Sequence, residues 1–435
     1  MHVYDFITDE FHYQLKQKAR KGNDRFEHVI KEYKTQFFQH LRQCKPDSPT
    51  RYLPSSLRKN KSVNEWLTLV CETIQKEESV AKQIFEEVID GYFLFLRGKH
   101  FLSTLKYQDL LERYNLLFEE DILNLSLFFR GTDLKGPGNK KFYHIPYNTR
   151  HKVKNQRFSF SGIPFLYLGA SIADIYFEFN QADLHTHEPY VAAFAFHPMD
   201  LNQIHSRQPK LFNITNLLFN GVNEQIAFLT DSNPKPPMKQ KKTLITDLTG
   251  CFRKLILSHV CTFPRRENGS AFCEEYVIPQ LFTEALRMHQ YDGIIFSSTS
   301  FSEQKITYSM PFPNLRFKDN LVWFTTYKED SLYDENLLDM FEITVKDMKG
   351  FGLSDKAVLE EKICHQIQDI EQQLSDRPDT IRCSYLRRSL ADISQRLGLY
   401  KDMKINGQLY LNTYAGKLEL IYTQNYLAFL ENQLL

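Results

Sequence analysis

The most informative part of this chain reads FFRG at 128–131, FYHIPYNTR at 142–150, RFSFSGIPFLYLGAS at 157–171 and DIYFE at 174–178. Within it, the glycine and proline between Ser161 and Pro164 predict a turn, because both residue types favour turn conformations. The apolar residues that follow predict a strand at 165–169, and the residues after them predict a helix entered near Ser171. This block therefore predicts a domain of mixed α and β structure.

Two charged side chains in this block are candidates for binding a ligand. Arg130 closes an apolar strand, so we expect its guanidinium at a sheet end beside Gly131, where a ligand can approach the backbone closely. A guanidinium suits an anion because its planar fork donates two parallel hydrogen bonds. The alternative is that Arg130 is an ordinary surface residue beside a strand and binds no ligand. Glu178 lies on an otherwise aromatic segment, and is either solvated or kept for a ligand hydroxyl or cation.

The first 120 residues are predicted to be mostly helical. Between Val63 and Phe95 the apolar residues fall largely at helical spacings, with charged residues between them. The stretch at 44–61 contains three prolines, interrupts this pattern and predicts a loop. We therefore predict a helical N-terminal domain at 1–120.

Helical spacing returns after residue 326. One apolar set runs from Leu359 to Leu374, and a second runs from Leu386 to Leu397. Two such stretches with a short link near 377–380 predict an antiparallel helical hairpin. Residues 327–435 are therefore predicted to form a helical C-terminal region.

The part between these regions, 121–326, has short apolar runs of strand length that alternate with turn-rich segments. Its stretch at 202–268 contains five prolines and the basic cluster KQKK, and predicts an insertion with at least one mobile loop. Basic residues are frequent at 135–157, and they form either the solvated face of a loop or a field that draws anions inward. His144, before a tight Ile-Pro turn, is expected to be structural rather than a catalytic base.

Composition excludes several classes of protein. The formal charge is +1, so no overall field recruits nucleic acid or an anionic membrane. The seven cysteines form no CxxC pair, which argues against a zinc site or a disulfide framework and favours a reducing compartment. The N-terminus lacks the pattern of a signal peptide, and no apolar run approaches the roughly 18–20 residues of a membrane span. We expect a soluble, cytoplasmic protein.

Taken together, these segments resemble the RES domain family, which is named for an Arg, a Glu and a Ser. The resemblance covers roughly residues 125–325 and consists of Arg130, the HIP element at 144–146, the core at 157–168, Glu178, and the later segments YVIPQ and YDGIIF with the serines that follow. It implies an α+β fold similar to ADP-ribosyltransferases. In that fold a split antiparallel β core binds NAD in a cleft, and here helical regions would flank it at both ends.

The resemblance also implies which residues act. Three match the positions for which the family is named and are expected to be catalytic: Arg130, Glu178 and Ser298. Four more are expected to bind the substrate NAD: Gly131, Arg157, Tyr167 and Ser297. Ser297 is also the alternative to Ser298 as the family's serine. No metal and no cofactor is implied, and inorganic phosphate is a co-substrate if the reaction is phosphorolysis.

The implied activity is cleavage of the nicotinamide–ribose bond of NAD by hydrolysis or phosphorolysis. Such cleavage passes through an oxocarbenium-like transition state. Glu178 would accept a hydrogen bond from a ribose hydroxyl and stabilise the developing charge, while Tyr167 stacks on the cationic nicotinamide ring. Arg130 and Arg157 would hold the pyrophosphate.

Other functions and partners stay open at this stage. ADP-ribosyl transfer to a protein would need an acid near Glu178, and the two preceding residues, Tyr176 and Phe177, do not supply one. A catalytically silent binding or regulatory module is the second alternative. Family members often act as the toxin of a bacterial toxin–antitoxin pair. We therefore expect a restraint, either an antitoxin or regulatory protein or an inactive homo-oligomer that a trigger such as phage infection releases.

Overall fold

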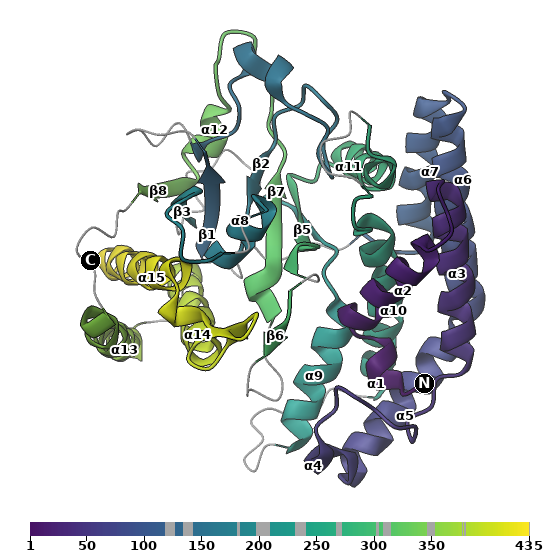
Figure 1. The fold of residues 1–435 in the computed structure, drawn as a ribbon, viewed down its shortest axis with the longest axis horizontal. Coiled ribbons are helices and arrows are strands. Elements are labelled where there is room, and N and C mark those ends of the chain that lie inside the picture. The colour runs from purple at the N-terminus through teal and green to yellow at the C-terminus, as the bar shows by residue number, and fades with distance from the viewer. Residues whose placement is uncertain are drawn as a thin grey trace. The chain divides into compact units, whose positions relative to one another are not determined.

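The computed structural model describes residues 1–117, 127–133, 142–180, 183–196, 209–230, 241–266, 272–301, 304–307, 315–345, 353–375, 377 and 380–434. The chain divides into two compact units, and each is built from separate stretches of sequence (Figure 1). The first unit contains residues 1–118, 154–161 and 212–290. The second contains residues 119–153, 162–211 and 291–435.

The first unit is almost entirely helical in its described part (Figure 1). Its elements are α1 (Val3–Phe6), α2 (Asp9–Arg20), α3 (Phe26–Arg42), α4 (Ser55–Arg58), α5 (Lys61–Lys76), α6 (Glu78–Leu96), α7 (His100–Arg113), α9 (Leu217–Thr230), α10 (Lys241–Cys261), a short 3-10 helix (Glu274–Tyr276) and α11 (Val277–Met288). The prediction that residues 1–120 are mostly helical is confirmed over the described residues.

An aromatic core holds the helices of this unit together. The Phe37 ring lies 5.2 Å from that of Phe6 and 5.3 Å from that of Phe85, so α1, α3 and α6 meet there. Phe252 of α10 is fully buried and stacks on Phe37 at 6.3 Å. Full burial of one such side chain stabilises a fold by roughly 1.5–3 kcal/mol. A helix of the predicted insertion thus fills the core of the first unit.

The second unit combines sheets with helices. Its elements are β1 (Leu127–Thr132), β2 (Leu166–Leu168), α8 (Ile172–Glu178), β3 (Tyr190–Phe196), β5 (Gly293–Ser297), β6 (Ile306–Thr307), β7 (Asp319–Trp323), α12 (Glu335–Leu338), β8 (Phe341–Val345), α13 (Leu353–Ser375), α14 (Ile381–Tyr400), β9 (Lys404–Ile405), β10 (Gln408–Leu409), α15 (Tyr414–Asn432) and short 3-10 helices (Tyr147–Lys152, Leu315–Lys318 and Tyr410–Asn412). Strand β4 (Leu211–Asn213) lies where the chain passes from this unit to the first. The fold is α+β, as predicted.

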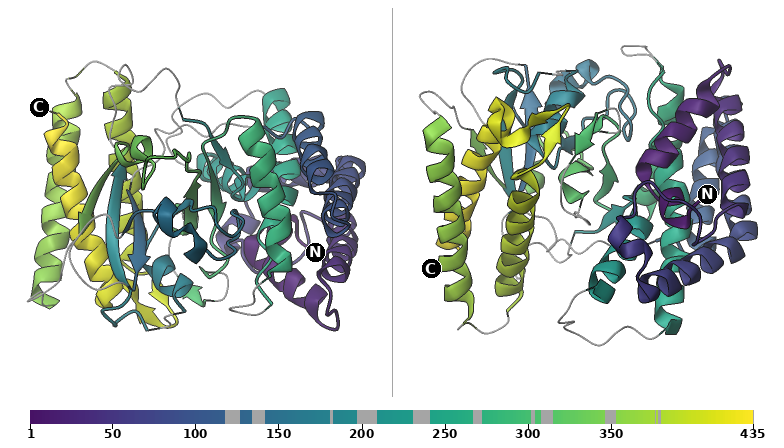
Figure 2. Two further views of the ribbon diagram at one scale, coloured as in Figure 1. Left: turned by 90° about the horizontal axis from the view of Figure 1, so that it is seen from above. Right: turned by 60° about the horizontal axis from the view of Figure 1, so that its bottom comes forward.

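The strands of the described chain form three sheets. Two have three strands, in the orders β1-β3-β8 and β10-β9-β6, and one has four, in the order β2-β7-β5-β4. The pairs β1–β3, β3–β8, β2–β7 and β5–β7 are antiparallel. Figure 2 shows α13 and α15 side by side in both of its views.

Sheet β1-β3-β8 is covered on both faces. Successive side chains of a strand point to opposite sides. Leu127 and Phe129 of β1 lie in a core with α8 and the C-terminal helices. Phe128 lies in a second core with residues of β2, β5 and β7. This sheet therefore separates the C-terminal helices from the four-stranded sheet.

Sheet β1-β3-β8 joins the four-stranded sheet between β1 and the end of β2. Phe129 and Gly169 exchange two backbone hydrogen bonds, each 2.8 Å long. We call this point the sheet junction. Gly169 packs closely against α8, because a Cβ there would lie 2.8 Å from Cδ1 of Ile175 and the Ile175 side chain would have to move. The junction therefore brings the N-terminal part of α8 directly onto the joined strands.

Several sequence predictions can be compared with these elements. The predicted hairpin is confirmed by α13 and α14, and the predicted strand and helix at 165–178 by β2 and α8. The predicted insertion contains β4, α9 and α10; residues 239 and 240 of its basic cluster lie outside the described residues, and residues 241 and 242 begin α10. The domain boundaries near 120 and 326 stay a prediction, since the compact units interleave along the chain.

Two other features bear on the expected class of protein. No helix in the described part of the chain is long and apolar enough to cross a membrane. All seven cysteines are free thiols.

Candidate functional site

Helix α8 places two carboxyl groups on one face. Ser171 caps its N-terminus, and the Ser171 Oγ accepts a hydrogen bond of 3.2 Å from the backbone N–H of Asp174. Asp174 and Glu178 are four residues apart, and side chains at this spacing lie one above the other on a helix. Paired acids of this kind are common in sites that handle a proton or a developing positive charge.

Asp174 contacts a serine far along the chain. The Ser298 Oγ donates a hydrogen bond to Asp174 Oδ1. Both side chains are buried, and Asp174 has no exposed surface. Its Oδ2 has no hydrogen-bond partner among the described residues. Burial raises the pKa of Asp174 well above its usual value, and the nearby Glu178 raises it further.

Glu178 makes a matching contact at the other end of the same helix face. Its Oε1 accepts a hydrogen bond of 3.1 Å from the Ser300 Oγ, and its side chain is exposed. Two residues of α8 thus face Ser298 and Ser300, which follow β5. We call Asp174, Glu178, Ser298 and Ser300 the acid–serine cluster.

The two candidate serines face different partners. Ser297, the last residue of β5, donates to Asp319 Oδ1 of β7 at 3.2 Å. The next residue, Ser298, faces α8 instead, as expected because successive side chains of an extended chain point to opposite sides. Of the predicted serines, Ser298 is therefore the one that shares a cluster with Glu178.

Arg130 lies within β1 rather than at its end. The prediction that it closes the strand is wrong, because β1 continues to Thr132, which pairs with Tyr190 of β3. Arg130 Nη1 donates to the carbonyl oxygen of Tyr167 at 2.8 Å. Burial lowers the pKa of Arg130 to about 10, so the guanidinium stays charged at neutral pH. The sheet junction thus brings Arg130 and Tyr167 together.

Gly131 provides space for α8. A Cβ at this position would lie 2.4 Å from Cγ2 of Ile175 and 2.9 Å from Cε2 of Phe179. Distances below 3.0 Å require one of the groups to move. The absence of a side chain at residue 131 is therefore explained by the packing of α8 on β1.

Arg157 belongs to the first unit, unlike the other predicted site residues. Its Nη1 donates to the carbonyl oxygens of Cys261 at 3.1 Å and Phe263 at 2.9 Å, at the C-terminal end of α10. Its guanidinium also lies 4.9 Å from the centre of the Tyr276 ring.

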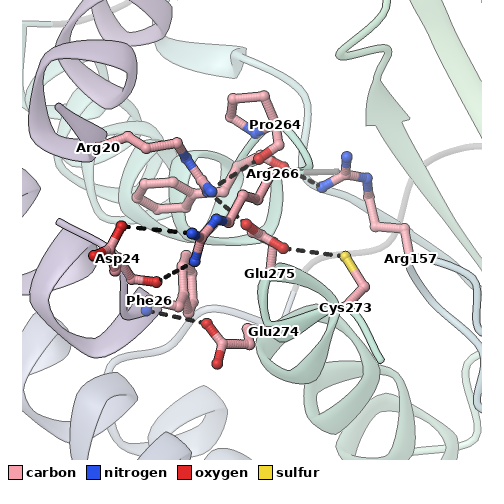
Figure 3. Close-up of polar contacts among 10 residues, drawn as sticks. Arg20, Asp24, Phe26, Arg157, Pro264, Arg266, Cys273, Glu274 and Glu275 are labelled. Carbon is pink, nitrogen blue, oxygen red and sulfur yellow. Dashed lines mark hydrogen bonds and ion pairs between the residues drawn. The ribbon is translucent and has the colours of Figure 1, made fainter. Parts of the chain in front are cut away.

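Two more basic side chains bind the same short segment. Lys16 Nζ donates to the carbonyl oxygen of Thr262 at 3.1 Å, and Arg20 donates to that of Pro264 at 3.2 Å. Figure 3 shows Arg20 also meeting Glu275, at 2.6 Å. The last carbonyls of a helix lack partners within it and carry partial negative charge. Arg157 therefore caps the end of α10 at Cys261, and Lys16 and Arg20 hold the segment that follows the helix.

The role predicted for His144 is confirmed. The side chain is fully buried, and its Nε2 accepts from the backbone N–H of Asp334 at 2.9 Å. Its Nδ1 contacts the carbonyl oxygen of Ile145 at 2.9 Å. Both ring nitrogens are thus occupied by backbone groups, and burial lowers the pKa of His144. It therefore holds the loop that precedes the short 3-10 helix.

Asp174 was not among the site residues predicted from the sequence. The available signal was its spacing of four residues from Glu178, which puts both carboxyls on one helix face. Ser300 was missed because a run of hydroxyl residues is ordinary loop composition. Among the described residues, no group of His, Cys, Asp and Glu is arranged to hold a metal ion.

The C-terminal region supports α8. Glu419 of α15 accepts hydrogen bonds from the backbone N–H of Ile172 at 2.9 Å and from the Tyr400 hydroxyl at 2.7 Å. The Tyr410 hydroxyl also donates to Glu419, and Arg396 of α14 donates to the carbonyl oxygen of Ala170. The start of the site helix is therefore fixed by residues that come more than 200 positions later.

Comparison with known proteins gives one distant similarity. No family model matches the chain, and no solved structure matches it. The chain is 24% identical over 286 residues to a Bacillus subtilis (strain 168) protein named "Putative toxin YopC". The aligned part is 62% of this chain and 58% of that protein, so this chain spans less than two thirds of its relative's length. The chain is thus similar to a protein whose name describes a toxin.

Proposed function

We propose that the second unit cleaves the nicotinamide–ribose bond of NAD and that the protein acts as a toxin. The observation that carries the proposal is the acid–serine cluster: an exposed carboxyl, Glu178, one turn from a buried one, Asp174, with both facing hydroxyls that follow β5. The resemblance to the RES family and the similarity to a protein named as a toxin support the same proposal.

Glu178 is the residue that would act on the ribose. In the transition state the ribose ring carries positive charge, and a carboxylate that faces it lowers the energy of that state. The Glu178 side chain is exposed, so a ligand can reach it, and Ser300 orients one of its oxygens. In this mechanism, Glu178 accepts a hydrogen bond from a ribose hydroxyl that strengthens as charge develops.

Arg130 and Tyr167 would bind the rest of the substrate. The Arg130 guanidinium keeps donors besides the Nη1–H that binds the Tyr167 carbonyl. A charged guanidinium in a largely enclosed position attracts an anion strongly, because little water screens it. We assign the pyrophosphate of NAD to Arg130 and the nicotinamide ring to the partly buried Tyr167 side chain.

The rival reaction, ADP-ribosyl transfer to a protein, needs an acid that can reach an incoming side chain. Asp174 is the acid one turn before Glu178, but it is completely buried. We therefore favour a small acceptor, either water or inorganic phosphate.

The test is loss of NAD and the mass of the products, with purified full-length protein, in the presence and absence of phosphate. We expect ADP-ribose in water and its phosphate ester with phosphate. Glu178→Gln should lower the rate by at least about 100-fold, while Glu329→Gln, at an exposed acid of the same unit, should not. NAD that stays intact both in this assay and in cells that express the protein would refute the proposal.

A further inference from the structure

We propose that Asp174 is a positioning residue of this site that works as a neutral acid: it holds the Ser298 hydroxyl and leaves Glu178 as the only charged carboxyl of the acid–serine cluster. This inference rests on the proposed function, because it assigns a role within the same site. It goes beyond it by naming the protonation state of a buried residue and the group through which that residue acts.

The burial of Asp174 favours its neutral form. Its side chain is completely buried, and Oδ2 has no hydrogen-bond partner among the described residues. An ionised carboxylate in such a place costs several kcal/mol unless it is paired and fully hydrogen-bonded. A protonated carboxyl avoids most of this cost, since it carries no net charge.

The charged groups around Asp174 also favour its neutral form. On its own helix Asp174 faces Glu178, and α15 contributes another acid, Glu419, at the start of α8. Two arginines of neighbouring elements bind carbonyl oxygens: Arg130 of β1 binds that of Tyr167, and Arg396 of α14 binds that of Ala170. Among the described residues, the charge that acts on Asp174 is thus that of another acid, Glu178, and none of them forms an ion pair with Asp174.

The neutral groups around Asp174 do not cancel the effect of burial on its pKa. Ser298 and the Asn320 amide of β7 both face the carboxyl and favour its charged form. Burial and Glu178 outweigh them, so the pKa of Asp174 lies well above its usual value. This direction agrees with the burial of Asp174, which also favours the protonated carboxyl.

The two acids, one turn apart, would then have different roles: Asp174 positions a hydroxyl, and Glu178 supplies the negative charge. A neutral Asp174 can bind the Ser298 hydroxyl without adding a second negative charge beside Glu178. Ser298 is thereby fixed at the end of β5, on the side that faces α8. Asp174 itself does not touch the substrate.

The protonation state can be measured without any activity. We would record infrared difference spectra of the full-length protein at neutral pH, wild type against Asp174→Asn. The carbonyl stretch of a protonated carboxylic acid is expected in the wild type and should vanish in the variant. The matched variant Asp330→Asn, at an exposed acid, should keep it. Absence of the band from the wild type would overturn the proposal, whether or not the protein cleaves NAD.

The positioning role is tested by kinetics of Asp174→Ala, Ser298→Ala and the double variant. If Asp174 acts through Ser298, all three lose turnover by a similar factor, about 10- to 100-fold, as when residues that orient active-site groups are removed. The KM for NAD should change little. Asp174→Asn should keep most of the turnover that Asp174→Ala loses. Independent losses that multiply in the double variant would overturn the role.

A pH profile tests the neutral state of Asp174 in a second way. With Asp174 neutral, Asp174→Asn should leave the acid limb of kcat/KM where it is in the wild type. An ionised Asp174 would oppose the charge on Glu178, so its replacement would move that limb to lower pH by about one unit or more. If the infrared band is present but the wild type leaves NAD intact, the proposed function fails while the neutral state of Asp174 stands.

Discussion

The backbone N–H of Ile172, the first residue of α8, donates a hydrogen bond of 2.9 Å to the carboxylate of Glu419 in α15. Tyr400 and Tyr410 donate to the same carboxylate, so three donors meet one buried acid. Glu419 is only 2% exposed. The helix that carries the candidate site thus depends on the C-terminal region for its position.

Removing this carboxylate should destabilise the second unit. In Glu419→Ala three buried donors lose their acceptor, and we expect a loss of about 3–5 kcal/mol, measured as a lower melting temperature by calorimetry. Glu361→Ala, at an exposed acid of α13, is the matched control and should melt like the wild type. Equal melting of the two variants would show that Glu419 does not hold α8.

Gly131→Ala should also disturb α8, because the new Cβ would meet Cγ2 of Ile175 at 2.4 Å. We expect a loss of about 1–3 kcal/mol. In a background of Ile175→Ala the same change should cost less, and a double-mutant cycle measures the difference. Gly398→Ala, in open space on α14, is expected to be neutral or to stabilise by up to about 1 kcal/mol. An equal cost of Gly131→Ala in both backgrounds would contradict the clash.

Arg157→Lys tests whether this residue caps α10 or binds the substrate. Lysine cannot donate in the same fork and lacks the planar face that lies over Tyr276. We expect the first unit to lose about 1–3 kcal/mol. The unfolding of this unit can be followed by Trp66 fluorescence in a Trp323→Phe background, since the chain has two tryptophans. A higher KM for NAD with unchanged unfolding would instead support the role predicted from the sequence.

Lys16 should make the stability of the first unit depend on pH. Burial lowers the pKa of Lys16 from 10.5 to about 7, and the nearby Arg157 also lowers it. Between these two values the unfolded chain binds more protons than the folded chain, so this group makes stability rise with pH from about 7 to about 10. The slope is at most about 1.4 kcal/mol per pH unit. The free energy of unfolding, measured in urea, should no longer rise with pH in this way in Lys16→Met. Lys18 is exposed, so Lys18→Met should keep the same pH dependence as the wild type.

Local patterns in the sequence predicted much of the fold. The strand and helix at 165–178 and the hairpin of α13 and α14 followed from apolar spacing and turn residues, because neighbours along the chain decide these elements. The end of β1 could not be predicted in this way. It is set by pairing with β3, whose residue Tyr190 lies opposite Thr132.

The candidate site was predictable only in part. Glu178 was a candidate from its aromatic surroundings and Ser298 from the family resemblance, and the structure places both in the acid–serine cluster. Asp174 was missed because its hydrogen-bond partner, Ser298, lies 124 residues away in the sequence. Arg157 was assigned to the substrate, yet its hydrogen bonds go to carbonyls about 105 residues further on, a contact that no local pattern reveals.

The interleaved order of the two units has a consequence for synthesis on the ribosome. Helices α1 to α7 are made first, but α10, which fills their core, ends at Cys261. At roughly 5–20 residues per second, the early helices wait on the order of ten seconds for it. The second unit is completed later still, because α8 needs Glu419. A chain that stalls before residue 419 therefore lacks the carboxylate that holds the start of α8, so the acid–serine cluster forms only after α15 has been made.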